Sequence, residues 1–306
     1  MFMPGKKKQP PYLKPGDEVG IISPSWFIDP SKLTEAVTYL EQWGLKVRIG
    51  RNAANQYGPF AGSDEERLSD LQIMTDDIDI KAVISSRGGY GLLRIIEKAD
   101  FSALRTNPKW YVGFSDITVL HNWLSNVCNI VSIHADMPLN FNNLKKTPET
   151  FDTLKSALFG ELKSLEWTGN VYRARPAKGE ITGGNLSLVY SLIGTPAEPE
   201  TNGKILFLED VGEYFYHIDR MLISLRMAGK LSGLSGLIIG GMNDINETRT
   251  PWGKSIEETV MDVVREYDYP VFFNFPAGHI ADNRAFYFGR KAEIENTGNN
   301  NLLKFL

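Results

Sequence analysis

The stretch Trp110-Tyr111-Val112-Gly113-Phe114-Ser115-Asp116-Ile117-Thr118 changes character abruptly at a single hydroxyl. Its apolar residues before Gly113 are typical of a buried strand, and Ile117 opens a helical pattern that continues through Leu120. No linker separates the two patterns. The stretch therefore predicts a strand that turns sharply into a helix, with Ser115 at the turn.

Outward from this stretch, the first half of the chain repeats the order of a short strand followed by a helix. Strand patterns lie at 19–22, 45–49, 82–84 and 110–112, and helical patterns lie at 30–44, 64–74 and 92–96. This alternation predicts an α/β fold in which a parallel sheet is covered by helices on both faces. Ligands of such sheets bind beyond the carboxyl ends of the strands, where Ser115 is expected.

The alternation stops near the middle of the chain, where prolines and an Asn-rich patch surround one helical pattern at 151–158. We therefore expect an N-terminal α/β domain over 1–140, a linker region over 141–175 and a C-terminal domain over 176–306. In the C-terminal domain, strand patterns at 204–208 and 237–239 each precede a helical pattern, and residues 285–294 are typical of antiparallel strands.

The composition belongs to an ordinary globular protein, since 42% of the 306 residues are hydrophobic, 23% are charged and the formal net charge is -4. The basic residues are scattered, so we expect no nucleic-acid partner. Cys128 is the only cysteine and neither H-E-x-x-H nor C-x-x-C occurs, so we expect no metal centre. The basic N-terminal stretch lacks a following apolar segment, and no run of about 18 apolar residues occurs, which favours a cytoplasmic protein without a membrane partner.

Ser115 has two interpretations. Serine is a favoured helix N-cap, so its hydroxyl can simply accept a backbone N–H of the first turn. Alternatively, so tight a turn holds the hydroxyl at the edge of the sheet, beside the N–H of Asp116, in a first turn where amides point outward and negative charge is favoured. The second interpretation predicts a nucleophile next to an oxyanion site, as in a nucleophile elbow. The G-x-S-x-G signature itself is absent, because position 117 is isoleucine.

A catalytic serine needs a base, and the chain has four histidines. His279 lies in a loop after an apolar strand pattern, a common setting for a catalytic base. His134 ends another apolar run and stays open as a site residue, whereas His121 and His217 lie in helical patterns as packing or salt-bridged residues. Glu209 ends a strand pattern, either as a solvated acid or as a carboxylate that orients an imidazole.

The segment Ser85-Ser86-Arg87-Gly88-Gly89-Tyr90-Gly91 follows a further strand pattern. Its two serines are rival nucleophiles, but neither stands at so tight a turn as Ser115. Its glycines either form a plain turn or let backbone amides face a phosphate, a carboxylate or an oxyanion. Neither G-x-x-x-x-G-K-[ST] nor G-x-G-x-x-G is present, so nucleotide binding has weak support.

Several short motifs, taken in order, resemble those of the LD-carboxypeptidase family, serine peptidases that trim murein tetrapeptides. The motifs are Leu13–Asp17 leading to Ile22–Ser25, Ser86–Gly91, Gly113–Asp116, Gly183–Leu186, Leu206–Asp210, Ile218–Arg220 and Pro276–His279. They extend over nearly the whole chain. One departure is Ala135 after His134, where the resemblance would place a glycine.

The resemblance implies a Ser-Glu-His triad with Ser115 as the nucleophile, Glu209 as the orienting carboxylate and His279 as the general acid and base. It also implies that the first domain carries the serine, and that the C-terminal domain, with a mixed or barrel-like β core, carries the other two. The oxyanion donors would be the N–H of Asp116 and one N–H from the Gly88-Gly89 turn.

The resemblance further implies that Arg87 holds a substrate carboxylate, since a guanidinium grips carboxylates bidentately. The implied reaction releases the terminal D-alanine of a murein tetrapeptide during peptidoglycan recycling and needs neither a metal nor a cofactor. Members of the family are commonly homodimers, and a homodimer is therefore expected here.

Two other functions compete with this one. The chain could be a peptidase of the microcin-immunity type, which cuts an amide between an amino acid and a nucleotide analogue, with Trp167 or Trp252 as a stacking surface for the base. It could also be a non-catalytic module that binds wall peptides through the Gly88-Gly89 loop, with Ser115 acting only as a cap.

Overall fold

The computed structural model describes residues 7–306, which form two compact units. The first unit contains the described residues up to Leu162 together with Ala281–Phe288, and the second contains Lys163–Ile280 and Gly289–Leu306. The units differ from the expected ranges. The range expected as a linker, 141–175, is divided between the units, because its helix belongs to the first unit and the strands Ser164–Trp167 and Val171–Tyr172 belong to the second. The chain also returns to the first unit at Ala281. The start of the basic N-terminal stretch lies outside the described residues.

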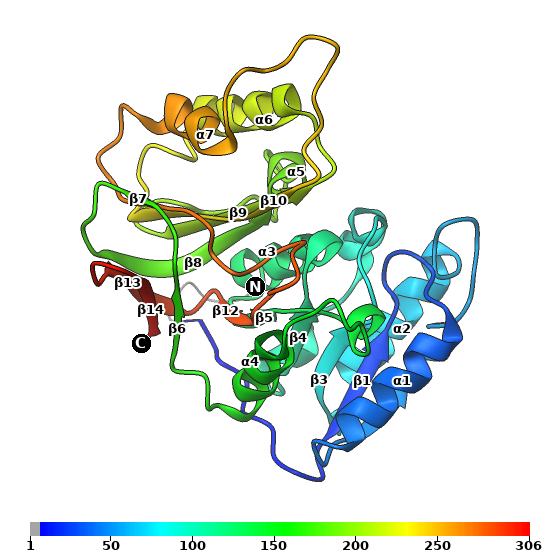
Figure 1. The fold of residues 1–306 in the computed structure, drawn as a ribbon. Helices are drawn as coiled ribbons and strands as arrows, with labels where there is room; N and C mark the ends of the chain where they lie inside the picture. Colours follow the sequence, from blue (N-terminus) through cyan, green and yellow to red (C-terminus); the bar gives the residue numbers. More distant parts are fainter. Residues whose placement is uncertain (1–6) are drawn as a thin grey trace. The chain divides into compact units, whose positions relative to one another are not determined.

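The first unit is built on a sheet with the strand order β12-β5-β4-β3-β1-β2 (Figure 1). The strands are β1 Glu18–Ile22, β2 Lys46–Ile49, β3 Ile80–Ser85, β4 Trp110–Gly113, β5 Ser132–His134 and β12 Phe286–Phe288. Strands β1 to β5 run parallel to one another, which confirms the α/β fold. The antiparallel pairing of β12 with β5 makes the sheet mixed, because a distant segment of the chain supplies this edge strand.

The helices of the first unit are α1 Pro30–Glu41, α2 Asp64–Asp76, α3 Thr118–Asn126 and α4 Pro148–Phe159. Five short 3-10 turns accompany them, namely η1 Leu92–Arg94, η2 Ile96–Lys98, η3 Ser102–Arg105, η4 Ser115–Ile117 and η5 Pro138–Asn140. The helix expected at 92–96 is therefore wrong. The N–H of Leu92 donates to the Asp116 carboxylate at 3.0 Å, and Ile95 has a φ of -123°, so a regular helix does not propagate there.

The second unit is built on a sheet with the order β6-β14-β13-β8-β9-β10-β11-β7. The strands are β6 Ser164–Trp167, β7 Val171–Tyr172, β8 Ala177–Asn185, β9 Ile205–Val211, β10 Gly236–Asn243, β11 Val271–Phe272, β13 Lys291–Asn296 and β14 Asn301–Phe305. Strands β8 to β11 are parallel and the remaining pairings are antiparallel. The mixed core is thus confirmed. Among the described strands the order ends at β6 and β7, so the sheet does not close into a barrel.

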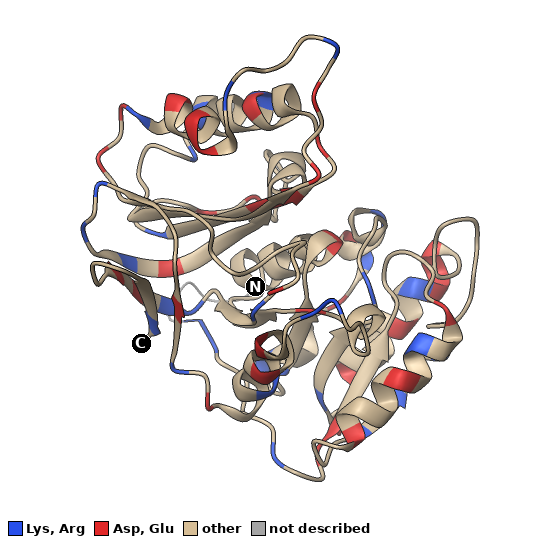
Figure 2. Ribbon diagram, viewed as in Figure 1, with Lys and Arg blue, Asp and Glu red and all other residues tan. Residues whose placement is uncertain are grey.

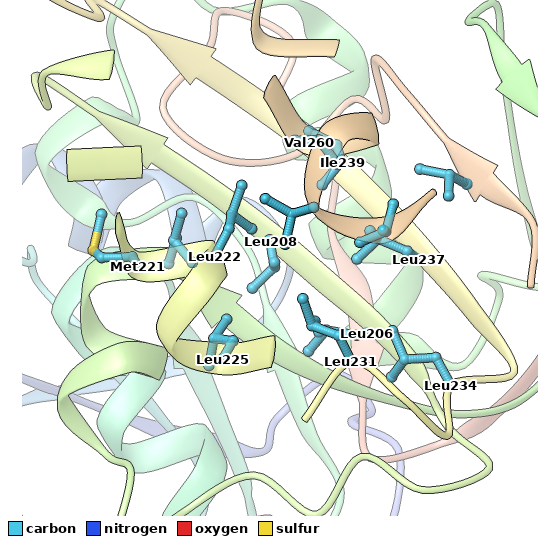
Figure 3. Close-up of a cluster of buried hydrophobic side chains, with 14 of the residues drawn as sticks. Leu206, Leu208, Met221, Leu222, Leu225, Leu231, Leu234, Leu237, Ile239 and Val260 are labelled. Carbon is cyan, nitrogen blue, oxygen red and sulfur yellow. The ribbon is translucent and has the colours of Figure 1, made fainter. Parts of the chain in front are cut away.

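The helices of the second unit are α5 Leu186–Ser191, α6 Phe215–Met227 and α7 Ile256–Val264. Helices α6 and α7 lie on one face of the sheet (Figure 1), where Leu208, Leu222, Ile239 and Val260 belong to one buried apolar cluster (Figure 3). Because successive side chains of a strand point to opposite faces, Leu208 packs against the helices while Glu209 faces the other side of the sheet.

Acidic and basic side chains are interspersed over the helices and loops of each unit (Figure 2). Within the described part of the chain, no helix is both long enough and apolar enough to cross a bilayer.

Candidate active site

The turn at Ser115 has the backbone geometry of a nucleophile elbow. Strand β4 ends at Gly113, and η4 begins at Ser115 and passes straight into α3. Ser115 has a φ of +64°, in the left-handed region that residues other than glycine rarely adopt. Neither η4 nor α3 has a side-chain cap, so the N-cap interpretation of Ser115 is wrong. The hydroxyl stands half-buried on a strained strand-to-helix turn.

A buried imidazole helps to hold this turn. The carbonyl of Gly113 accepts the N–H of Ala135 at 3.1 Å and lies 2.8 Å from Nε2 of His121. A carbonyl can only accept, so His121 carries its proton on Nε2, and its Nδ1 accepts from the Ser132 hydroxyl at 2.8 Å. Complete burial lowers the pKa of His121 to about 4. His121 is therefore a neutral packing residue.

Asp116 contributes two groups to the elbow. Its N–H lies in the first turn of η4, where backbone N–H groups have no acceptor within the helix. Its buried carboxyl accepts from the Ser25 hydroxyl at 2.5 Å and from the Leu92 N–H at 3.0 Å, and burial raises its pKa. The other carboxyl oxygen has no partner within residues 7–306.

The Asp116 carboxyl thereby ties the loops that follow β1 and β3 to the elbow. Sequence reasoning considered only the backbone N–H of this residue. Nothing in the local pattern marks Asp116 as buried, because its partners come from distant segments.

The glycine turn after β3 lies directly against the elbow. A Cβ on Gly88 would lie 2.8 Å from Oγ of Ser115 and 3.3 Å from the backbone nitrogen of Asp116. Gly89 has a φ of +111°, and a Cβ there would lie 2.4 Å from the ring of Trp26. The structure thus brings Gly88, Ser115 and the N–H of Asp116 together, and only glycine leaves room for the serine hydroxyl.

Arg87 lies one residue before this turn. Its guanidinium carbon is 5.5 Å from the centroid of the Trp26 ring, and Nη1 donates to the carbonyl of Phe27 at 2.9 Å. Its Nε has no partner among the described residues. Burial lowers the pKa of Arg87, but a guanidinium stays charged at neutral pH. A fixed positive charge therefore stands directly before the glycine turn.

Glu209 and His279 form a hydrogen-bonded pair in the second unit. Glu209 lies within β9 rather than beyond its end, and its side chain is fully buried. Oε2 of Glu209 lies 2.7 Å from Nδ1 of His279 and accepts the His279 backbone N–H at 3.2 Å. A carboxylate that accepts from Nδ1 fixes the tautomer and orientation of an imidazole. The structure brings Glu209 and His279 together, while Ser115 belongs to the first unit.

The loop that carries His279 leaves room for the Glu209–His279 pair and is held in place by hydrogen bonds. Gly278 has a φ of +110°, and a Cβ there would lie 2.6 Å from Oε2 of Glu209. The loop is fixed to β10, because Asn243 donates from its side chain to the carbonyl of His279 at 2.8 Å and the N–H of Gly241 donates to Ala277 at 2.9 Å. A side chain at position 278 would push the carboxylate away from the imidazole.

Asp210 faces the opposite side of the sheet from Glu209. Its carboxyl accepts from the Asn185 side chain at 3.0 Å, from the Ser187 N–H at 2.9 Å and from the Val211 N–H at 2.8 Å. Burial, reinforced by the neighbouring Glu209 charge, raises the pKa of Asp210 to about 7. Asp210 therefore anchors the start of α5.

The other side chains that the sequence offers as candidates are buried or paired with neighbouring side chains. Ser85 and Ser86 are buried, and the Ser86 hydroxyl lies 2.6 Å from that of another buried serine. His134 is buried and stacks on Phe286 at a centroid distance of 4.6 Å. His217 pairs with Glu213 at 2.6 Å through its Nδ1. Within residues 7–306, no group of three or more histidine, cysteine and acidic side chains is close enough to hold a metal ion.

The chain matches the model of the LD-carboxypeptidase N-terminal domain over residues 19–135 and that of the LD-carboxypeptidase C-terminal domain over 178–294. It is 37% identical over 290 residues to a probable murein peptide carboxypeptidase of Bacillus subtilis, covering 94% of this chain and 91% of that protein. A muramoyltetrapeptide carboxypeptidase from Oxalobacter formigenes has a similar structure, with a TM-score of 0.86 and 27% identity over 94% of this chain and 98% of that one. An MccF-like protein from Bacillus anthracis matches with a TM-score of 0.85 and 25% identity over 97% and 99% of the two chains.

Two matched domains that together make up most of the chain define its class, which is a peptidase. The chain belongs to the LD-carboxypeptidase family, and the resemblance indicated by its motifs is confirmed.

Proposed function

We propose that this chain is a serine carboxypeptidase that releases the terminal D-alanine of murein tetrapeptides by hydrolysing the bond between an L-centre and that residue. The observation that carries the proposal is the buried Glu209–His279 pair, with 2.7 Å between Oε2 and Nδ1, in a chain that holds Ser115 on a strained elbow. The murein peptides in the names of the similar proteins support this substrate.

In the proposed reaction, His279 takes the hydroxyl proton of Ser115 while Oγ attacks the carbonyl carbon of the scissile bond. The N–H groups of Asp116 and of the Gly88-Gly89 turn stabilise the oxyanion of the tetrahedral intermediate. His279 then gives the proton to the departing amine of D-alanine. A water molecule then loses a proton to His279 and attacks the ester carbonyl. The bond to Oγ breaks, His279 returns the proton to Oγ of Ser115, and the shortened peptide leaves as a carboxylate.

Glu209 holds the imidazole in one orientation and stabilises the imidazolium that forms. Arg87 binds a carboxylate of the substrate, a role supported by its fixed charge and by its Nε, which has no partner in the described part of the chain. We further propose a cytoplasmic homodimer that acts in peptidoglycan recycling. Light scattering after size exclusion tests the dimer, and a mass of one chain would contradict it.

Mass spectrometry of a muropeptide mixture tests the reaction. Incubation with the enzyme should remove one alanine from tetrapeptides and leave pentapeptides unchanged. Ser115→Ala should lose about 10³-fold or more in kcat with an unchanged circular dichroism spectrum. Equal turnover in that variant would remove Ser115 from the mechanism.

A nucleotide-linked amide is the alternative substrate, supported by the MccF-like relative. The two tryptophans considered for stacking a base do not favour it. Trp167 is only 5% exposed and donates from its ring to the carbonyl of Phe273 at 3.0 Å. Trp252 stacks on Phe215 at 6.5 Å and donates to Thr259. Parallel assays on both substrates distinguish the two functions, and peptide binding without hydrolysis would favour a non-catalytic module.

A further inference from the structure

Exposed aromatic rings follow the carboxyl edge of the sheet in the first unit. Trp26 follows β1, Tyr57 and Phe60 follow β2, and Tyr90 follows β3, and we call these four residues the aromatic strip. Trp26 is 38% exposed, Tyr57 70% and Tyr90 44%. Backbone bridges join Phe60 to Trp26 and to Tyr57, and the Phe60 and Tyr90 rings are 6.0 Å apart. Grouped exposed rings of this kind mark a binding surface.

A cavity of about 280 Å³ lies at the β2 end of the strip. Its lining includes Tyr57, Phe60, Ser63, Asp64, Glu65 and Arg94. The Arg94 guanidinium lies 5.6 Å from the centroid of Phe60, and its Nε donates to Asp64 at 2.9 Å. Drug-sized ligands occupy about 300–1,000 Å³, so this cavity has room for about one ring.

The residues that line the cavity indicate which kind of ring it can bind. Aromatic faces accept the C–H groups on the face of a sugar, while carboxylates and a guanidinium bond the hydroxyl and amide groups at its rim. Hydrogen bonding to Arg94 holds the pKa of Asp64 low, and hydrogen bonding to backbone N–H does the same for Glu65. Asp64 is paired with Arg94, so Glu65 leaves the lining with one net negative charge, which disfavours the phosphates of a nucleotide. A neutral hydroxylated ring fits better.

The spacing along the sheet matches the length of the substrate. Strand β1 is the second neighbour of β4, so its end lies about 10 Å from the end of β4, and β2 lies about 5 Å further. Three residues separate the scissile bond of a murein tetrapeptide from its sugar, and an extended chain of that length spans about 10 Å. A peptide that reacts at Ser115 can therefore place its sugar between Trp26 and Tyr57.

We propose that the aromatic strip and its cavity bind the sugar ring of a muropeptide, so that the enzyme prefers sugar-linked tetrapeptides to free ones. This inference rests on the proposed function, because the spacing is counted from Ser115 as the nucleophile.

The test compares kcat/KM for an N-acetylmuramyl-tetrapeptide and for the free tetrapeptide. The wild type should prefer the sugar-linked substrate. Tyr57→Ala removes the most exposed ring of the strip and should lose about tenfold on that substrate and less than about twofold on the free peptide. Tyr190→Ala removes an exposed ring of the second unit, 40% exposed, and should change neither value. Equal losses on both substrates, or no loss on either, would overturn the proposal.

Calorimetric titration with N-acetylmuramyl-L-alanyl-D-isoglutamine, which lacks the scissile bond, separates this proposal from the catalytic one. Binding that Tyr57→Ala weakens about tenfold would support the sugar site even if no tetrapeptide were hydrolysed. If the enzyme hydrolysed free and sugar-linked tetrapeptides at equal rates and did not bind the muramyl dipeptide, the sugar site would be contradicted. The proposed peptidase function would be unaffected by that result. Tighter binding of adenosine monophosphate than of the muramyl dipeptide would also contradict the proposed sugar site.

Discussion

Replacing Glu209 by glutamine isolates the negative charge behind His279. Oε2 of Glu209 lies 2.7 Å from Nδ1 of His279 and accepts its backbone N–H, so the glutamine must place its oxygen there to keep both hydrogen bonds. Its amide nitrogen then occupies the position of Oε1, which has no partner among the described residues. The tautomer of His279 is preserved, and only the charge is lost.

Two magnitudes follow from this geometry. A buried amide without a partner costs about 1–3 kcal/mol of unfolding free energy. A unit charge about 4 Å from the imidazolium contributes about 4 kcal/mol at an effective dielectric constant of about 20. The second figure corresponds to a fall of about 10³-fold in kcat, since about 1.4 kcal/mol is a factor of ten.

The assay couples released D-alanine to D-amino-acid oxidase, and circular dichroism checks the fold. Glu213→Gln is the matched control, because Glu213 also contacts a histidine Nδ1, that of His217, at 2.6 Å. The control should keep kcat within about twofold, as expected of a pair outside the mechanism. A Glu209→Gln variant that stays folded and keeps kcat within about threefold of the wild type would refute the reasoning, since it would show that the charge does not act in the transition state.

Two further substitutions test the local packing and the buried imidazole. Gly88→Ala adds a Cβ that would lie 2.8 Å from both Cβ and Oγ of Ser115, so kcat should fall about 10²-fold, and an unchanged kcat in a steady-state assay would contradict this. His121 has its pKa lowered from 6.5 to about 4, so the unfolded state takes up its proton first as the pH falls through this window. Protonation of His121 should therefore lower the unfolding free energy by up to about 3 kcal/mol between pH 6.5 and pH 4, in addition to the contributions of other titrating groups. The His121→Gln variant should lack this part of the pH dependence. Denaturant titrations across this range would contradict the account if both proteins gave the same slope.

The parts of the fold that follow from local pattern were predictable from the sequence. Strands β1 to β4 and the helices α1, α2 and α3 follow one another as the periodicity indicates, and the abrupt change of pattern at Ser115 marks the turn. The position of β12 as the antiparallel edge strand of the first sheet was not predictable, because nothing around Phe286 indicates which sheet this strand joins. The 3-10 turns after Gly91 depend on the distant carboxyl of Asp116, which takes the N–H of Leu92.

The candidate site also has features that the sequence predicts and features that it does not. Family motifs single out Glu209 and His279, and the structure brings them into contact, whereas the catalytic roles of these residues and of Ser115 remain predictions. Sequence reasoning missed the Ser25–Asp116 hydrogen bond and the supporting role of His121. Both depend on which face of an element is buried, and that is decided by long-range packing.

The central claim is that His279 activates Ser115, and labelling with a fluorophosphonate probe tests it most directly. Intact-mass and peptide mapping should find one adduct, on Ser115, in the wild type. The rate of labelling should fall about 100-fold or more in His279→Ala, because a serine hydroxyl is a weak nucleophile without its base. An adduct on another residue, or an equal rate in the two proteins, would contradict the account.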